Sequence, residues 1–123
     1  MNEKDVIEII INHINQQFPR TCPNCDKPFD SLKEWLEGTT HAGDPISYDV
    51  EDKDWETVSH VGTLSLANCS CGSTIGISSK GMGLATMTKL MFWAKKETAA
   101  RDLTPRELLR DIRDKIDRII LDE

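Results

Sequence analysis

The sequence has few aromatic residues and no long hydrophobic run. Aromatic residues make up 6% of the 123 residues, and the longest apolar cluster, Val6 to Ile11, is interrupted by Glu8. A membrane-spanning helix needs about 20 predominantly apolar residues, so we expect no membrane span. The chain does not open with the basic segment, apolar stretch and cleavage site that form a secretory signal. We therefore expect a cytoplasmic protein, whose thiols stay free.

Positive charge is also scarce. The formal net charge is −6, and residues 1–60 carry five Lys and Arg against thirteen Asp and Glu, whereas residues 61–123 carry ten against eight. Nucleic-acid affinity comes largely from clustered Lys and Arg that neutralise phosphates, so this balance argues against nucleic-acid binding. A local basic face at Arg106, Arg110 and Arg113 keeps a nucleic-acid-binding, transcription-related role open as an alternative, although acidic residues alternate with these arginines.

The length and the apolar spacing predict a single domain that contains four helices. A chain of this length is typical of a single domain, and residues 1–123 show no internal repeat. Asn2 is expected to cap the first helix, and Ser31 with Glu34 forms a capping box before the second. Before the last helix, Thr104, Pro105 and Glu107 supply an N-cap, a first-turn proline and a capping box. Apolar periodicity predicts four helices: residues 3–17, a short segment between Ser31 and Gly38, a long segment from Gly83 to about Ala100, and a last segment that begins at Thr104.

Alternating polarity predicts one β-hairpin. The runs at residues 57–66 and 73–78 alternate, and the segment CSCG lies between them, so we expect a hairpin whose turn carries Cys69 and Cys71. Residues 39–56 contain six acidic residues and no sustained period, which predicts an exposed acidic loop. The glycine and glutamate spacing of a calcium-binding EF-hand is missing from this loop. The expected fold class is α+β.

The four cysteines occur as two close pairs, Cys22/Cys25 and Cys69/Cys71. Zinc prefers four tetrahedral ligands, with each thiolate about 2.3 Å from the metal, and two tight turns can each supply two of them at a low entropic cost. The spacing therefore predicts a four-cysteine Zn²⁺ site. Because such a site exists only when the two turns meet, we expect metal binding to stabilise the fold.

The residues around the cysteines fit tight turns. Pro23 fixes a φ angle in the first turn, and Gly72 can adopt the positive φ that lets backbone N–H groups point at sulfur. At the corresponding position of the first turn stands Asp26, which tolerates that conformation less well than glycine does. The backbone N–H groups of these turns are expected to donate hydrogen bonds to sulfur and so to offset part of the negative charge of four thiolates.

The segments CPNCDKPF and CSCG resemble the two zinc knuckles of zinc-ribbon proteins. This resemblance covers only the two segments, and it implies a metal-ligand role for Cys22, Cys25, Cys69 and Cys71 and a zinc-ribbon-like hairpin plus knuckle flanked by about four helices. It implies no particular activity, because zinc ribbons occur in transcription factors, ribosomal proteins, enzymes and adaptors. The helices, the long acidic insert and the one-residue gap of the second pair depart from a minimal ribbon.

Two alternatives use the same cysteines. A thiol-redox site would use Cys22 and Cys25, but such pairs usually lie at a helix N-terminus, whereas Pro23 follows the first cysteine and no long helix starts there. Four thiolates can also bind iron, and the sequence does not separate iron from zinc.

The sequence does not predict an enzyme. A catalytic zinc keeps a ligand position open for water, whereas four thiolates would fill the shell. His13 and His60 lie on apolar faces, and His41 lies in the expected loop, where it could exchange with a cysteine ligand. Since no acid–base or nucleophile–base arrangement is recognisable, we expect a non-enzymatic regulatory or protein-interaction module.

Two helical faces are candidates for a protein partner or for a homodimer. Methionine and aromatic side chains adapt well to partner surfaces, and the last helix has near-heptad apolar spacing. The competing interpretation is that these helices pack against their own domain. The candidate residues are Met87, Met91, Phe92 and Trp93 on the third helix and Leu109, Ile112, Ile116 and Ile119 on the last.

The segment Gly81-Met82-Gly83 follows a predicted strand and opens a helix. It is similar to the start of a dinucleotide-binding fingerprint, but about 37 residues remain after it, too few for a second βα unit. We expect a plain strand-to-helix turn. Whether Lys80 and this helix N-terminus hold an anion stays open.

Overall fold

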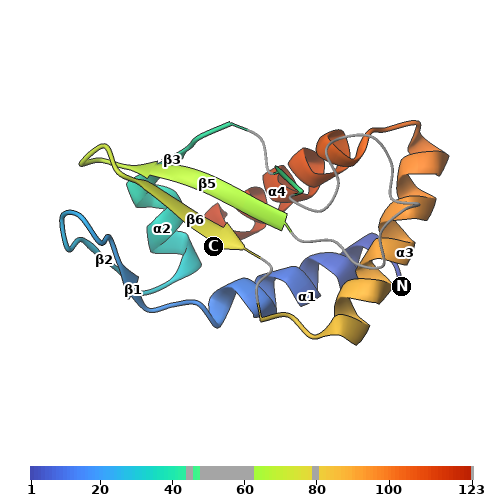
Figure 1. The fold of residues 1–123 in the computed structure, drawn as a ribbon, viewed down its shortest axis with the longest axis horizontal. Coiled ribbons are helices and arrows are strands. Elements are labelled where there is room, and N and C mark those ends of the chain that lie inside the picture. The colour runs from blue at the N-terminus through green and yellow to red at the C-terminus, as the bar shows by residue number, and fades with distance from the viewer. Residues whose placement is uncertain (44–45, 48–62, 79–80, 123) are drawn as a thin grey trace.

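The computed structural model describes residues 1–43, 46–47, 63–78 and 81–122. Within these ranges, four helices and short antiparallel strands form an α+β fold (Figure 1), which confirms the predicted class. The helices are α1 (Glu3–Asn15), α2 (Leu32–Gly38), α3 (Leu84–Arg101) and α4 (Pro105–Leu121). The strands are β1 (Arg20–Thr21), β2 (Pro28–Phe29), β3 (Thr39–His41), β4 (Ile46–Ser47), β5 (Thr63–Cys69) and β6 (Thr74–Ser78).

The helices begin at the capping residues that the sequence predicts. Asn2 caps α1 and Thr104 caps α4, each in a full capping box in which side chain and backbone bond reciprocally. Ser31 Oγ accepts the backbone N–H of Glu34 at 3.2 Å and so caps α2. Helix α1 ends at residue 15 rather than at 17. None of the helices in the described ranges is long and apolar enough to cross a membrane.

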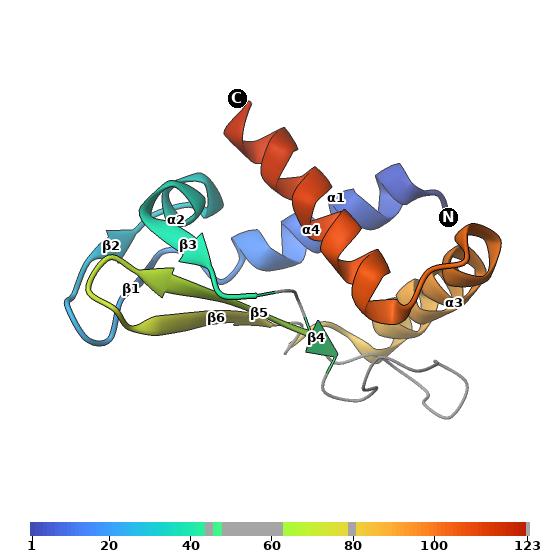
Figure 2. The same ribbon diagram turned by 90° about the horizontal axis from the view of Figure 1, so that it is seen from above.

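Strand β5 is the centre of the larger sheet. Strand β6 pairs with one edge of β5 as the predicted hairpin, with Ala67 opposite Ile75. Strands β3 and β4 pair one after the other along the other edge, where Thr39 lies opposite Cys69 and Ile46 opposite Leu64 (Figure 2). The hairpin prediction is therefore confirmed for the described residues.

The acidic loop predicted for residues 39–56 is wrong at two places, because β3 and β4 lie within it. The physical reason is the free edge of β5, whose backbone N–H and C=O groups need partners. Segments of two or three residues can satisfy that edge without any apolar alternation of their own. Residues 44–45 and 48–56 lie outside the described residues, as do His60 and Lys80.

A second, two-stranded sheet holds the first cysteine pair. Strands β1 and β2 pair antiparallel, with Arg20 opposite Phe29 and Thr21 opposite Pro28. Figures 1 and 2 both place this hairpin beside the tip of the β5–β6 hairpin, at the end of the molecule away from α3. Two segments that are far apart in sequence therefore meet at one end of the fold.

The core lies between the sheet and the helices. Trp35, Phe29 and Leu108 are among the largest fully buried side chains, and the same cluster includes two cysteines, Cys22 and Cys69. Burial of such side chains is the main favourable term in folding. The cysteine-bearing turns are thus continuous with the hydrophobic core.

The residues proposed for a partner surface divide into two groups. Met91, Trp93, Ile112 and Ile116 are buried within the chain and belong to its core, and Met87 and Leu109 are half-buried. Phe92 is 60% exposed and Ile119 is 44% exposed. Internal packing thus accounts for the buried members, and association through the exposed ones stays a prediction.

An ion-pair network joins α1, α3 and α4. Lys115 Nζ lies 2.7 Å from Glu3 Oε1 and 3.0 Å from Asp111 Oδ2, and Arg101 Nη1 lies 3.2 Å from the same Asp111 oxygen. Single exposed pairs contribute little to stability, whereas networks contribute more. This network connects the three longest helices.

The cap of α4 gives a direct test of the fold. Because Thr104 satisfies a backbone N–H that has no helical partner, Thr104→Ala is expected to lower the free energy of unfolding by about 1 kcal/mol. Thr104→Ser, which keeps the hydroxyl, is the matched control and should lose much less. Urea unfolding of the metal-loaded proteins measures both changes. Equal stability of all three proteins would contradict the capping interaction.

Candidate metal centre

The β1–β2 turn folds back on itself and so places Cys25 beside Cys22. The Cys22 N–H donates to the Lys27 carbonyl at 2.9 Å, and the Asp26 N–H donates to the Cys22 carbonyl at 2.9 Å. Asp26 closes the turn with a φ of 63°, in the left-handed region. An aspartate tolerates this region better than most residues do, so the turn forms without glycine.

The β5–β6 turn repeats this arrangement with one residue fewer. The Cys69 N–H donates to the Ser73 carbonyl at 2.8 Å, and the Gly72 N–H donates to the Cys69 carbonyl at 2.9 Å. Gly72 has a φ of 95°, and so takes the position that Asp26 has in the first turn. The shorter turn explains the one-residue gap between Cys69 and Cys71.

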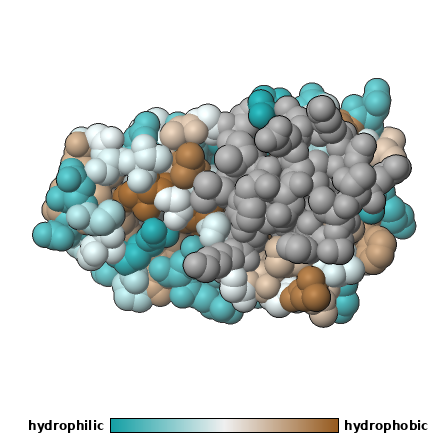
Figure 3. Space-filling view, viewed as in Figure 1, coloured by the Kyte–Doolittle hydropathy of each residue, from teal (hydrophilic) through white to brown (hydrophobic). Residues whose placement is uncertain are grey.

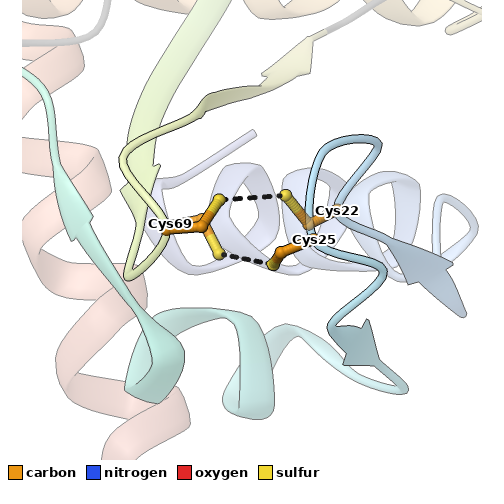
Figure 4. A group of neighbouring side chains, drawn as sticks. Cys22, Cys25 and Cys69 are labelled. Atoms are coloured by element: carbon orange, nitrogen blue, oxygen red, sulfur yellow. Dashed lines mark hydrogen bonds between the residues drawn. The ribbon is translucent and has the colours of Figure 1, made fainter.

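The two turns bring four sulfur atoms together. Cys22 Sγ lies 3.7 Å from Cys71 Sγ, and Cys25 Sγ lies 3.7 Å from Cys69 Sγ. All four Sγ atoms lie within 4.8 Å of one another. Figure 4 shows Cys22 and Cys25 pointing from the first turn toward Cys69 at the end of β5. The four cysteines could therefore hold a metal ion.

The distances fit a single ion bound by four thiolates. A tetrahedron with four metal–sulfur bonds of about 2.3 Å has an edge of about 3.8 Å, close to the observed contacts. A disulfide bond would need about 2.05 Å, and all four cysteines are free. Both 3.7 Å contacts join one turn to the other, so an ion among the sulfurs would fasten the two turns together.

Each turn contributes one buried and one exposed cysteine. Cys22 and Cys69 are buried, whereas Cys25 and Cys71 are exposed. The sulfur cluster thus has an inner side against the core and an outer side toward solvent. A metal ion could reach the cluster from the outer side, and the buried cysteines would connect it to the core.

Hydrogen bonds to sulfur favour a thiolate on the second turn. Asn24 Nδ2 donates to Cys71 Sγ at 3.4 Å. This side chain, together with the backbone N–H and the hydroxyl of Ser73, lowers the pKa of Cys71 to about 5. The backbone N–H of Cys71 in turn lowers the pKa of Cys69. A cation would therefore meet negative charge first on the CSCG turn.

The pKa of Cys25 shifts in the opposite direction, upward. A hydrogen bond from the backbone of Lys27 lowers its pKa, but desolvation and the three neighbouring cysteine side chains together raise it to about 12. Several thiols this close cannot all ionise without a cation. Binding a metal at four cysteines would therefore release protons from the cluster.

Two side-chain bonds hold the first turn against the β5–β6 hairpin. Arg20 Nη1 donates to the Gly76 carbonyl at 2.9 Å, and Gln17 Nε2 donates to the Ser78 carbonyl at 2.9 Å. Both acceptors lie on β6, so the chain around β1 is fixed beside the hairpin by contacts outside the cysteines. The four sulfurs are thereby brought into position partly by protein contacts alone.

The two histidines in the described ranges, His13 and His41, lie outside the cysteine cluster. His41 Nε2 pairs with Asp117 Oδ2 on α4, and the four-sulfur group includes neither His41 nor His13. The exchange of His41 with a cysteine ligand, one of the sequence predictions, is therefore wrong. Its cause is β3, which directs His41 toward α4 instead of leaving it in a loop.

The other predicted sites are only partly described. Gly81 has a φ of 91°, and Gly83 is the N-cap of α3 without a side-chain cap bond. An anion site there stays a prediction, because Lys80 lies outside the described residues. On α4, Arg113 Nη1 donates to the Gly43 carbonyl at 2.6 Å, so this arginine of the predicted basic face makes an internal contact.

Sequence reasoning missed Asn24 and Arg20, which support the site without belonging to the cysteine pattern. The available signal for Asn24 was its place between two ligands in CPNC, from which an amide can reach a neighbouring sulfur. Arg20 gave no local signal, because its acceptor is 56 residues away.

No family model, curated protein or solved structure matches this chain. The fold and the site together define an α+β protein with a four-cysteine cluster that could bind a metal. Its function is therefore inferred from the geometry of that cluster.

Asn24 supplies a test of the outer hydrogen bonds. Asn24→Ala removes the amide donor to Cys71, and loss of such a bond typically weakens metal binding by about 10- to 100-fold. A competition titration with a chromophoric zinc chelator measures the change. Asn12→Ala, the same substitution at an exposed position of α1, is the matched control and should leave the affinity unchanged. An unchanged affinity of Asn24→Ala would contradict this role.

Proposed function

We propose that Cys22, Cys25, Cys69 and Cys71 bind one Zn²⁺ ion, and that the protein is a non-enzymatic protein-interaction or regulatory module built around this structural site. The observation that carries the proposal is the meeting of four sulfurs at 3.7 Å contacts between two turns that are far apart in sequence. Free thiols gain nothing from such proximity, whereas a divalent cation stabilises it.

A structural role follows from the ligand set. Four thiolates complete a tetrahedral zinc shell and leave no position for a water molecule or substrate. The ligands belong to two hairpin turns that the ion would join, and two of the cysteines are part of the core. Metal binding would thus contribute free energy directly to folding.

The close sulfur contacts also favour one ion over an iron–sulfur cluster. An iron–sulfur cluster distributes four cysteines over two or four iron atoms, so cysteines on different irons would have sulfurs farther apart than the edge of one tetrahedron, whereas all four Sγ atoms here lie within 4.8 Å of one another. A single iron would have nearly the same geometry as zinc. Zinc is proposed because four-cysteine structural sites of this turn type typically hold zinc.

The sulfur–sulfur contacts and the cysteine pKa shifts favour metal binding over a thiol-redox role. A redox pair would form a disulfide within the CPNC turn, whereas the two 3.7 Å contacts connect cysteines of different turns. The thiol with the lowered pKa of about 5 is Cys71, outside that turn, while the pKa of Cys25 is raised. A reactive CxxC pair needs a cysteine of its own turn with a lowered pKa.

Exposed apolar residues support a protein-interaction role. Leu84 is 66% exposed and Phe92 is 60% exposed, and both lie on α3 eight residues apart, a spacing that puts them on one helix face. On the visible face in Figure 3, hydrophobic residues gather in small patches among hydrophilic ones. The support for a partner contact is therefore the pair of large exposed side chains on α3, since aromatic residues are enriched at protein interfaces.

Elemental analysis tests the metal assignment. Protein purified without added metal is expected to contain one zinc per chain and no thiol that reacts rapidly until a chelator is added. Chelation should then expose four thiols and weaken the fold. Cys25→Ser and Cys71→Ser should each lose zinc, and Ser70→Ala, a change between two ligands that removes no sulfur, is the matched control. One iron per chain, or no metal with two fast-reacting thiols, would overturn the proposal.

A further inference from the structure

A cavity lies between the helices and the larger sheet, and none of the four cysteines lines it. It has a volume of about 170 Å³, is partly open, and is lined by side chains from α1, α2, α3, α4, β3, β5 and β6. Most of the lining is apolar, including Ile10, Leu90, Leu108 and Ile112. When this cavity is unfilled, its apolar lining lacks packing contacts that a bound molecule could supply.

Three polar nitrogens belong to the side chains that line this cavity. Among the described residues, His13 Nε2, Trp35 Nε1 and His41 Nδ1 are buried and have no hydrogen-bond partner. These side chains come from α1, α2 and β3, and all three line the cavity. Buried polar atoms without partners are uncommon, and their grouping around one cavity indicates a missing partner within it.

Trp35 sets the first requirement for that partner. Its side chain is 2% exposed, and an indole N–H can only donate a hydrogen bond. Water outside the protein cannot reach this nitrogen. The partner must therefore carry a hydrogen-bond acceptor.

His41 sets the second requirement. Its Nε2 faces the carboxylate of Asp117, which accepts hydrogen bonds, so Nε2 carries a proton. Nδ1 is then an acceptor that needs a donor if the ring is neutral, and a donor that needs an acceptor if the ring is protonated. His13 can adapt to either role by its choice of tautomer. A hydroxyl group provides both an acceptor and a donor.

The cavity volume limits the size of the molecule. An apolar cavity of about 150 Å³ can hold benzene, whereas pockets for larger ligands occupy about 300–1,000 Å³. A volume of about 170 Å³ suits a single ring with one small substituent. A nucleotide or a peptide would extend beyond this volume.

We propose that this cavity binds a small, mainly apolar molecule of about one ring that carries a hydroxyl group, with phenol as the simplest example. The apolar lining buries the ring, and the Trp35 indole N–H donates to the hydroxyl oxygen. This site goes beyond the proposed zinc function and does not depend on it.

Binding of phenol and toluene to the zinc-loaded protein tests the proposal. The two probes have nearly the same size, but toluene lacks the hydroxyl. Calorimetry is expected to show saturable phenol binding, about tenfold tighter than that of toluene, which is the ratio for one net hydrogen bond. No saturable phenol binding, or equal affinity for both probes, would overturn the proposal.

Two variants locate the binding. Trp35→Phe removes the N–H and keeps an aromatic ring, so it should bring the phenol affinity down to that of toluene. Ala94→Leu fills space at the cavity wall and should abolish binding of both probes. Zinc content and circular dichroism check that each variant is folded. Unchanged phenol binding in either folded variant would contradict the assignment.

The wild-type protein gives the same test without a substitution. Phenol, but not toluene, should shift the NMR signal of the Trp35 indole proton downfield, because only phenol offers it an acceptor. An unmoved signal at saturating phenol would overturn the proposal, even if a variant failed to fold.

Discussion

Four sulfur atoms must meet at one point, and much of this fold serves that constraint. Each sulfur pair lies in a tight hairpin turn that ends in a residue with positive φ, Asp26 in one turn and Gly72 in the other. The two turns are joined by sulfur contacts of 3.7 Å and by bonds from Arg20 and Gln17 to β6. Without a cation, the same sulfurs would be packed thiols that gain little from one another.

The site and the core support each other. Cys22 and Cys69 are buried with Phe29 and Trp35, so an ion bound on the outer side would be connected to the hydrophobic cluster through its own ligands. Strand β5 carries Cys69 at its end and pairs with β3, β4 and β6. The turn that holds Cys69 is therefore attached directly to the central strand of the sheet. A small domain buries a limited apolar area, so its core alone gives a small free energy of unfolding. A metal ion bound at this site would increase that free energy.

The sequence predicts those features that depend on neighbouring residues. The caps at Asn2, Ser31 and Thr104, the four helices and the hairpin with CSCG at its tip are local patterns, and the structure confirms them. The close spacing within each cysteine pair likewise predicted that the four would meet. By contrast, β3 and β4 were missed because two or three residues show no period, and their pairing depends on an edge of β5 that lies later in the chain. The cavity was missed for the same reason, since His13, Trp35 and His41 come from three elements.

Cobalt substitution tests the central claim, that the two turns form one tetrahedral four-thiolate centre. Titration of the metal-free protein with Co²⁺ should saturate at one ion per chain. The spectrum should show the intense visible absorption of tetrahedral cobalt and a thiolate-to-cobalt charge-transfer band whose intensity corresponds to four thiolates. Zinc should then displace the cobalt and remove the colour. A titration that does not saturate at one ion, or a spectrum with fewer than four thiolates, would contradict the account.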